Sequence, residues 1–439
     1  MVNKYFTSSE KMNHSVEIKM DEDNEQDLPN GKDKTKVNLE GGDDTENKNE
    51  DEENKEKEKI IKISLTKDIL PFVVPLSCIL TMDNDRMDFV KMLENIKNNE
   101  SLLQVFNDQS TIWWNNRDII NLITDIVKKY VKKNSETYNI AIQFKMSLQS
   151  LIDRPKELLE LIDSCLKPKE LEKKKHGEVF TPMSIVEKML DYLDEQYVTE
   201  NGKSIFTEKH LKWLDPANGM GNYPIAVYLR LMKGLVKEIP DSKLRKKHIL
   251  EQMLYMAEFN KKNVFVTRQI FDIKNEYNLN IIHGDSLDNN ILDVKKFLKV
   301  DSYENVICIG NPPYQKNLES KKGSAPALYN KFIDKFIDKC KYQSFIIPSR
   351  WFAGGKGLDK FRENMLKRKD IVYIKHFDDA SKIFGNNVDI KGGVNYYLKS
   401  TNYNGMCCYN GNLIDLNKYD ILVDSQFYNL VNRLINHEN

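Results

Sequence analysis

The chain has 439 residues, enough for two or three domains, and its 66 basic and 66 acidic side chains give no net charge. Its six cysteines form no Cys-x-x-Cys pair, which argues against a disulfide framework and a zinc site, so no metal is expected. No apolar stretch is long enough to span a bilayer. We therefore expect a soluble protein, not secreted and not membrane-bound, in the cytoplasm of a bacterium or of a virus-infected host cell.

The composition of the N-terminal part of the chain changes at about residue 60. Residues 1–60 carry 18 acidic and 10 basic side chains and few branched apolar ones, which predicts a disordered acidic tail. The tail could act as an acidic mimic of DNA, although a solubilising tail is the better explanation of its composition. Residues 61–175 show helical periodicity, for example at residues 119–127, and predict a helical domain.

Beyond Gly177, short apolar runs alternate with helical stretches. Runs such as Trp213–Leu214, Leu254–Ala257 and Val306–Ile309 each end in polar residues or glycine. This pattern predicts an α/β fold with a parallel sheet over residues 176–400, followed by a C-terminal extension at 401–439. Ligands of such sheets bind beyond the carboxyl ends of the strands, where these polar residues gather.

The first motif of this region is Gly-Glu-Val-Phe-Thr-Pro, which ends in Phe180, Thr181 and Pro182. Threonine is a good N-cap and proline suits the first turn of a helix, so the Thr-Pro pair predicts a helix start. Capping does not explain the four residues that precede the pair.

The second motif is the loop Asp-Pro-Ala-Asn-Gly-Met-Gly, which runs from Asp215 to Gly221 after an apolar run. Its glycines, Gly219 among them, would let the backbone approach a ligand closely, with Ala217 as a small neighbour. The loop lacks the Lys-Ser/Thr pair of a triphosphate-binding loop. An acid ahead of the glycines suits a cationic sulfonium better than a phosphate.

Two further acids stand at expected strand ends. Glu258 could accept hydrogen bonds from both hydroxyls of a ribose, and Asp285 could accept one from an adenine amine. Either carboxylate alone is better explained as a solvated residue, and only their order and spacing along the chain favour a site.

The sharpest motif is Asn311-Pro312-Pro313-Tyr314, directly after the apolar run Val306–Gly310. Two prolines fix an extended backbone and remove two N–H donors, which leaves carbonyl oxygens beside an amide side chain. Such acceptors suit a planar amine like that of adenine, because they would localise its lone pair toward an electrophilic methyl group. Tyr314 could stack on a base taken out of a duplex.

In this order the motifs resemble the gamma-type adenine-N6 DNA methyltransferases, in particular the methylase region of fused type II restriction–modification enzymes. The resemblance spans about Lys169 to Leu398 and implies a Rossmann-like, S-adenosylmethionine-dependent methyltransferase sheet with an N-terminal helical domain. It implies adenine N6 methylation in double-stranded DNA, with the target adenine flipped. The implied catalytic residues are Asn311, Pro312, Pro313 and Tyr314. The implied cofactor-binding residues are Phe180, Thr181, Asp215, Ala217, Gly219, Glu258 and Asp285.

The match continues through residues 345–352, 354–357 and 392–397, which are similar to later strands and to the wall of the target-base pocket. Arg350, Trp351 and Lys356 could touch DNA phosphates or the flipped base, or form a packed surface turn. The family usually has a target-recognition domain after the methylase fold, and only about 40 residues remain here. Sequence recognition is therefore expected to rest on the N-terminal helical region or on a separate specificity or restriction subunit as a partner, unless the chain is a fragment.

Alternatives remain at this stage. Asn-Pro-Pro-Tyr also occurs in enzymes that methylate a protein glutamine amide, and RNA is a further substrate class. The chain could also be a non-catalytic, cofactor-binding modification subunit, although intact Asn311 and Tyr314 argue against this. Methylation of cytosine C5 is disfavoured, because Cys308 lies inside the preceding apolar run rather than at the site.

Overall fold

The computed structural model divides the chain into two compact units, residues 1–149 and residues 150–439. Most of the acidic N-terminal tail lies outside the residues that the structure describes. The described residues are 15–20, 59–64, 89–114, 117, 119–130, 145–148, 150–165, 181–315, 326–355, 357–385, 390–423, 427, 430 and 433.

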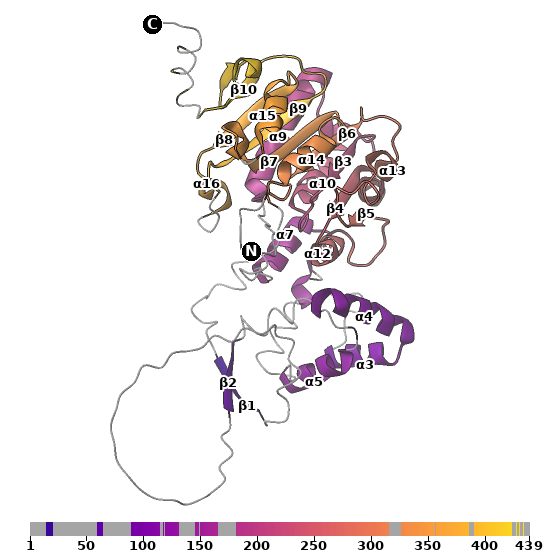
Figure 1. The fold of residues 1–439 in the computed structure, drawn as a ribbon. Helices are drawn as coiled ribbons and strands as arrows, with labels where there is room; N and C mark the ends of the chain where they lie inside the picture. The colour runs from indigo at the N-terminus through magenta and orange to yellow at the C-terminus, as the bar shows by residue number, and fades with distance from the viewer. Residues whose placement is uncertain are drawn as a thin grey trace, which may run out of the picture. The chain divides into compact units, whose positions relative to one another are not determined.

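The described part of the first unit contains one strand pair and a group of helices (Figure 1). Strands β1 (Ser15–Met20) and β2 (Lys59–Ser64) pair in antiparallel register, which the composition of residues 1–60 did not suggest. Helices α3 (Phe89–Lys97), α4 (Glu100–Trp114) and α5 (Ile120–Tyr130) follow. Their apolar faces bury Phe89, Leu93, Phe106, Ile123 and Val127, as the helical periodicity predicts for this part of the chain.

The second unit is built on a nine-stranded sheet. Its spatial order is β11-β10-β8-β9-β7-β6-β3-β4-β5. The strands are β3 (Lys212–Asp215), β4 (Leu254–Glu258), β5 (Asn280–His283), β6 (Val306–Gly310), β7 (Tyr342–Pro348), β8 (Ile371–Phe377), β9 (Val394–Ser400), β10 (Cys407–Tyr409) and β11 (Asn412–Ile414).

The sheet is mixed rather than parallel throughout, which corrects the expectation from the sequence. Strand β9 lies between β7 and β8 and is antiparallel to both, and β11 is antiparallel to β10. The reason is topological: β9 follows β8 through the short segment 378–393, and it inserts beside β7 in the opposite direction. The five strands from β3 to β7 remain parallel to one another.

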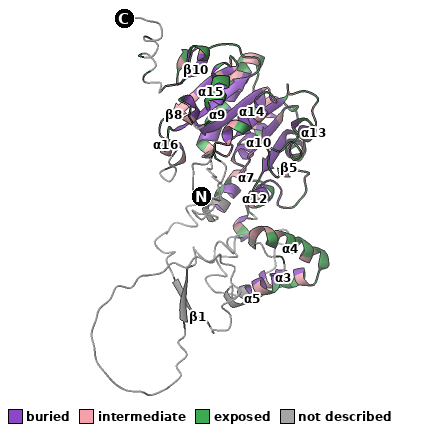
Figure 2. Cartoon of the chain, viewed as in Figure 1, coloured by how far each residue is buried: buried purple, intermediate pink, exposed green. Residues whose placement is uncertain are grey.

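Helices cover both faces of the sheet, so its central strands are buried almost completely (Figures 1 and 2). One face packs against α9 (Met183–Asn201), α10 (Asn222–Gly234) and α12 (Lys261–Asp272). The other face shares a core with α13 (Val294–Leu298), α14 (Tyr329–Phe336) and α15 (Asp359–Leu366). The remaining helices of this unit are α7 (Pro155–Cys165), α11 (Ser242–His248), α16 (Ser381–Phe384), η3 (Ile205–Thr207), η4 (Ile249–Met253), η5 (Ser349–Phe352) and η6 (Leu416–Lys418).

The unit boundaries differ from the domains expected from the sequence. Helix α7, which falls within the expected helical domain, contacts α10 and α12 of the second unit, because it buries Leu158 and Leu161. At the other end, β10 pairs with β8 and so extends the sheet into the expected C-terminal extension. Both differences arise from contacts between segments that are far apart in the sequence.

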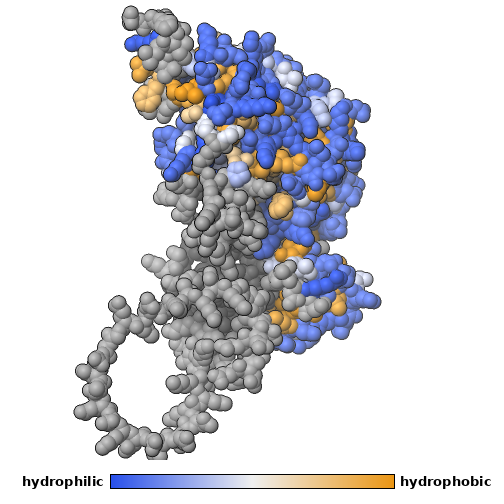
Figure 3. Space-filling view, in the orientation of Figure 1, coloured by the Kyte–Doolittle hydropathy of each residue, from blue (hydrophilic) through white to orange (hydrophobic). Residues whose placement is uncertain are grey.

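The surface of the second unit visible in Figure 3 is mainly hydrophilic. In the described parts of the chain, no helix is long and apolar enough to cross a membrane.

The strand order places a crevice at the carboxyl ends of β3 and β6. Strand β3 pairs with β4 on one side and with β6 on the other, so the chain leaves β3 in one direction and returns on its opposite side. In open α/β sheets this switch point is where ligands bind, because the two connections diverge and leave space between them. Asp215 ends β3, and Asn311 directly follows β6.

Candidate active site

A cavity of about 630 Å³ lies at this switch point. Nine of the eleven site residues expected from the sequence line it. They are Thr181, Ala217, Gly219, Glu258, Asp285, Asn311, Pro312, Pro313 and Tyr314. Phe180 lies outside the described residues, and Asp215 lies behind the wall of the cavity rather than in it.

The glycine loop after β3 forms one wall of the cavity. Gly219 has φ +55° and Gly221 has φ +102°, a left-handed region that side-chain-bearing residues rarely adopt. The chain then enters α10 at Asn222, whose side-chain amide donates a hydrogen bond to the Thr181 carbonyl at 2.8 Å. The Gly-x-Gly sequence therefore turns the backbone sharply, and Asn222 ties it to the Thr-Pro motif.

Asp215 supports this loop from inside the protein. The side chain is only 2% exposed, and its Oδ1 accepts a hydrogen bond from the Ala217 N–H at 3.0 Å. Its Oδ2 is buried and has no hydrogen-bond partner among the described residues. Burial raises the pKa of Asp215 to about 8; the Ala217 N–H lowers it in part, and the nearby Glu258 raises it further. The carboxyl group therefore holds the loop and keeps its proton near neutral pH.

The raised pKa of Asp215 predicts that the cofactor-free protein loses stability as the pH rises from about 4 to about 8. In this range the unfolded chain releases the Asp215 proton while the folded protein keeps it, so the free energy of unfolding falls with pH. Asp215→Asn should flatten this dependence, because a neutral amide replaces the acid. Denaturant unfolding at pH 5 and pH 8 measures this pH dependence of the free energy of unfolding. Asp301→Asn is the control, because Asp301 is an exposed aspartate. An unchanged pH dependence in Asp215→Asn would exclude Asp215 as the titrating group.

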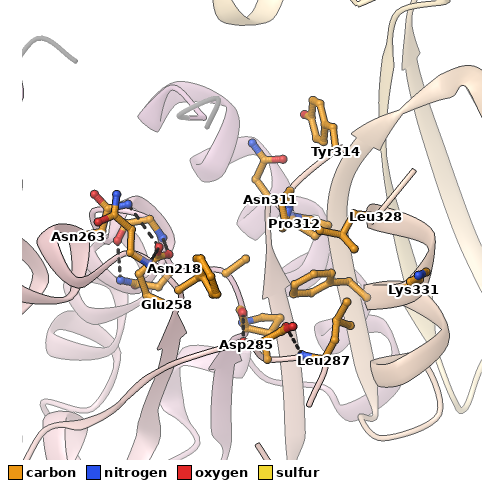
Figure 4. A pocket seen from close by; sticks show the side chains of 18 of the residues that line it. Asn218, Glu258, Asn263, Asp285, Leu287, Asn311, Pro312, Tyr314, Leu328 and Lys331 are labelled. Carbon is orange, nitrogen blue, oxygen red and sulfur yellow. Dashed lines mark hydrogen bonds between the residues drawn. The ribbon is translucent and has the colours of Figure 1, made fainter. Parts of the chain in front are cut away.

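Glu258 joins the end of β4 to the glycine loop. Its Oε2 accepts a hydrogen bond from the Gly219 N–H at 2.8 Å, and its Oε1 accepts one from the Asn260 N–H at 2.7 Å. The carboxylate is 8% exposed, and that fraction faces the cavity. In Figure 4, Glu258 lies with Asn218 and Asn263 across the cavity from Asn311. A carboxylate that main-chain N–H groups hold in place is suited to accept further hydrogen bonds from ligand hydroxyls.

Asp285 follows β5 and forms the next part of the wall. Its Oδ1 accepts a hydrogen bond from the Leu287 N–H at 2.9 Å, which fixes the turn after β5 (Figure 4). Ser286 beside it is buried and donates its hydroxyl hydrogen bond to the Pro216 carbonyl at 2.5 Å. The Asp285 side chain itself is exposed in the cavity, so it is available to a ligand.

Asn311, Pro312, Pro313 and Tyr314 lie on the opposite wall, where the chain leaves β6 (Figure 4). Tyr314 is 7% exposed, and its carbonyl accepts a hydrogen bond from the Leu328 N–H at 3.1 Å. Burial raises the pKa of Tyr314 far above its usual range, although a hydrogen bond with the Asn311 side chain lowers it in part. The hydroxyl is therefore neutral at physiological pH, and the ring is held in place beside the amide.

Several residues of the cavity were not among the site residues expected from the sequence. The most informative are Phe259 and Lys331. Phe259 directly follows Glu258 and is 67% exposed, which is unusual for a large aromatic side chain. Its position after a strand-end acid was a signal in the sequence. Lys331 comes from α14, and no local pattern pointed to it. The others are Pro216, Asn218, Asn222, Tyr223, Asn260, Asn263, Gly284, Ser286, Leu287, Asp288, Gln315, Leu328 and Phe332.

The cavity fits S-adenosylmethionine, the cofactor that the sequence resemblance implies. Its volume is in the usual range for small-molecule sites. Among the described residues that line it, three supply carboxylates, Glu258, Asp285 and Asp288, and Lys331 is the one cation. This charge balance suits a ligand with a sulfonium and an ammonium group, and the exposed Phe259 ring offers a surface on which a nucleobase can stack.

Comparisons with known proteins agree with this geometry. Residues 241–384 match the family described as Eco57I restriction-modification methylase, a segment that includes Glu258, Asp285 and Asn311. A Mycoplasma pneumoniae protein described as an uncharacterized adenine-specific methylase is 28% identical over 316 residues, which cover 57% of this chain and 71% of that protein.

Among solved structures, the cryo-EM structure of a DrdV–DNA complex has a TM-score of 0.52 and 16% sequence identity. The match covers 77% of this chain and 36% of the DrdV chain, so this chain spans about a third of that protein. The type IIG restriction endonuclease BpuSI matches with a TM-score of 0.42 and 13% identity, over 84% of this chain and 40% of that chain.

The fold and the family match together confirm the α/β class and the cofactor expected from the sequence. Matched segment 241–384 contains the strands that carry Glu258, Asp285 and the Asn-Pro-Pro-Tyr motif, and the remaining strand with the glycine loop completes the same cavity. Residues 241–384 are thus similar to restriction–modification methylases of the Eco57I type, and the sheet of the second unit has the fold of the matching part of the DrdV chain.

Proposed function

We propose that this chain transfers a methyl group from S-adenosylmethionine to the N6 amine of adenine in DNA. The observation that carries the proposal is that the Asn-Pro-Pro-Tyr motif shares one cavity with the carboxylates of Glu258 and Asp285. The adenine-specific description of the Mycoplasma relative supports adenine as the base, and the DNA complex of DrdV supports DNA as the polymer.

The hydrogen-bond acceptors after β6 explain why we propose an amine as the group that receives the methyl. In this proposal the Asn311 side-chain oxygen and the Pro312 carbonyl accept the two hydrogens of a planar –NH2 group. Neither Pro312 nor Pro313 has an N–H, so no main-chain donor competes for the same place. Accepting both hydrogens withdraws the nitrogen lone pair from the ring and directs it out of the ring plane. When bound, S-adenosylmethionine supplies an electrophilic methyl group.

Tyr314 orients the base. Its ring is buried beside Asn311, and its hydroxyl stays neutral, so it offers an aromatic face without a charge. An adenine inside a duplex cannot place its amine beside Asn311, because the acceptor lies within a cavity wall. The target adenine therefore leaves the base stack and lies against Tyr314, at a cost of a few kcal/mol of lost pairing and stacking.

Recognition of a DNA sequence needs surface beyond this cavity. The chain covers about a third of the DrdV chain, and the restriction–modification relatives contain further parts. We propose that a separate specificity or restriction subunit supplies them, with this chain as the methyl-transferring component.

Transfer of labelled methyl groups from S-adenosylmethionine to unmethylated genomic DNA tests the proposal, followed by mass spectrometry of the nucleosides. We expect N6-methyladenine as the only methylated nucleoside. Total RNA and a glutamine-containing release-factor protein serve as competing substrates in parallel reactions. Label in RNA or in a protein amide, with none in DNA, would contradict the proposal and favour the other planar nitrogen substrates.

A further inference from the structure

A second, smaller cavity of about 180 Å³ lies beside the catalytic loop. It shares Tyr314 and Gln315 with the first cavity but is formed by different strands. Its other lining residues are Ala327, Tyr329, Pro348, Arg350, Ile390 and Lys391. Arg350 follows the carboxyl end of β7, and Lys391 precedes the start of its antiparallel neighbour β9, so both lie at the sheet edge that carries Asn311.

The segments that carry the two cations are fixed to each other. The Ser349 N–H donates a hydrogen bond to the Gly393 carbonyl at 3.0 Å, and the Asn395 side chain donates one to the Ser349 hydroxyl at 3.1 Å. Trp351, the neighbour of Arg350, is completely buried. Trp351 is therefore a core residue and does not contact a base. Of the two roles that the sequence left open for it, it has that of a packed residue in the turn.

The turn before β9 requires glycine. Gly393 has φ +72°, and a Cβ at this position would lie 1.9 Å from the Phe377 carbonyl oxygen. No side-chain-bearing residue fits there without moving β8 or β9. The turn that presents Lys391 is thus defined by backbone packing, and not by contacts of the lysine itself.

The positive charge at this cavity has no counter-charge among the described residues. Arg350 is partly buried, and neither it nor Lys391 has a described carboxylate within 4.0 Å. Arg350 and Tyr329 line the same cavity. Burial raises the pKa of Tyr329, and the charge of Arg350 lowers it in part. No acidic side chain lines the cavity in the described parts of the chain.

Other partly buried arginines of the same unit differ from Arg350 in this respect. Arg230 pairs with Glu187, Arg362 with Asp359, and Arg368 with Asp370. Partial burial of a guanidinium without such a partner costs free energy, which an anionic ligand would recover. Arginine and lysine together are the side chains that bind phosphate oxygens most often.

We propose that Arg350 and Lys391 bind a phosphodiester of the DNA strand that carries the target adenine. The subsite rests on the proposed function, since it borders Tyr314, against which the adenine would lie. The backbone phosphate of a nucleotide whose base enters the first cavity must pass close to this loop. Two cations at this point would fix the backbone and so place the base relative to Asn311.

The salt dependence of DNA binding tests the subsite independently of methyl transfer. The logarithm of the binding constant for a short duplex is measured against the logarithm of salt concentration, by fluorescence anisotropy. We expect Arg350→Gln and Lys391→Ala each to lower the magnitude of the slope by about 1. Each should weaken DNA binding by a similar factor for duplexes of different sequence. Arg350→Lys should keep the slope of the wild type, because it keeps the charge.

Lys247→Ala provides the matched control. Lys247 is exposed on α11, which leads into the amino end of β4, the edge of the sheet away from the site. An unchanged slope in both Arg350→Gln and Lys391→Ala, relative to Lys247→Ala, would overturn the subsite. If the loss of DNA affinity in these variants depended on the identity of the base beside the adenine, the subsite would also be overturned, since the cations would then contact a base edge.

The experiments distinguish failure of the phosphate subsite from failure of the proposed function. If the wild type binds DNA with the expected change of slope but labels RNA or protein instead of DNA, the proposed reaction is wrong and the phosphate contact stands. If the wild type methylates DNA while the slopes of the variants do not change, the reaction stands and the phosphate subsite is wrong.

Discussion

Asn311→Ala is expected to reduce methyl transfer to DNA by at least about 100- to 1,000-fold, the loss typical of removing one group that stabilises a transition state by hydrogen bonding. The variant keeps the Pro312 carbonyl but loses the amide oxygen, so only one amine hydrogen finds an acceptor and the lone pair stays delocalised. Affinity for S-adenosylmethionine should remain within a few-fold, because the carboxylates of Glu258 and Asp285 lie on the opposite wall. Single-turnover rates and calorimetry measure the two effects separately.

Asn290→Ala is the matched control for this variant. Asn290 is an exposed asparagine of the loop after β5, and it does not line the cavity. It should retain the activity of the wild type, which shows that loss of an asparagine side chain alone has no effect. Methyl transfer within ten-fold of the wild type in Asn311→Ala would contradict the proposed role of the amide.

Gly310→Ala is expected to impair both stability and activity. A Cβ on Gly310 would lie 2.7 Å from Oδ1 of Asp215, the oxygen that accepts the Ala217 N–H. The carboxyl group is buried and its Oδ1 is held by the Ala217 N–H, so the added methyl group strains both loops. We expect the free energy of unfolding to fall by about 1–3 kcal/mol, as for other overpacked cores. Cofactor affinity and methyl transfer should fall together, because the glycine loop and Asn311 shift at once.

A double-mutant cycle with Asp215→Ala checks this mechanism. Removing the Asp215 carboxyl opens the space that the new methyl group needs, so the double variant should be more stable than the sum of the single changes predicts. Denaturant unfolding of the four proteins gives the interaction energy. Strict additivity would mean that the clash with Asp215 is not the cause of the loss.

The motifs of the site could be read from the sequence because each is local. Asp215, Glu258, Asp285 and Asn311 each directly follow or end a short apolar run, and parallel strands bring their carboxyl ends to one edge. The amide and two prolines in Asn311–Pro313 define an acceptor set without reference to the rest of the fold. This is why nine expected residues lie around one cavity.

Other features depend on segments that are distant in the sequence. Local periodicity does not specify which strand pairs with which, so it did not show that β9 inserts antiparallel between β7 and β8. The sequence also predicted that Asp215 would contact the ligand, whereas its side chain is buried and is not among the described residues that line the cavity. Arg350 and Lys391 are 41 positions apart, and only the β7–β9 pairing brings them to one cavity.

The sequence by itself determined the α/β class, the order of the ligand-binding loops and the acceptor motif, because short-range patterns encode strands, turns and side-chain chemistry. The tertiary structure decided the mixed sheet, the supporting place of Asp215 and the position beside Tyr314 of two cations that have no carboxylate partner among the described residues. These depend on strand pairing and on the burial of charge, and both are properties of contacts between distant parts of the chain.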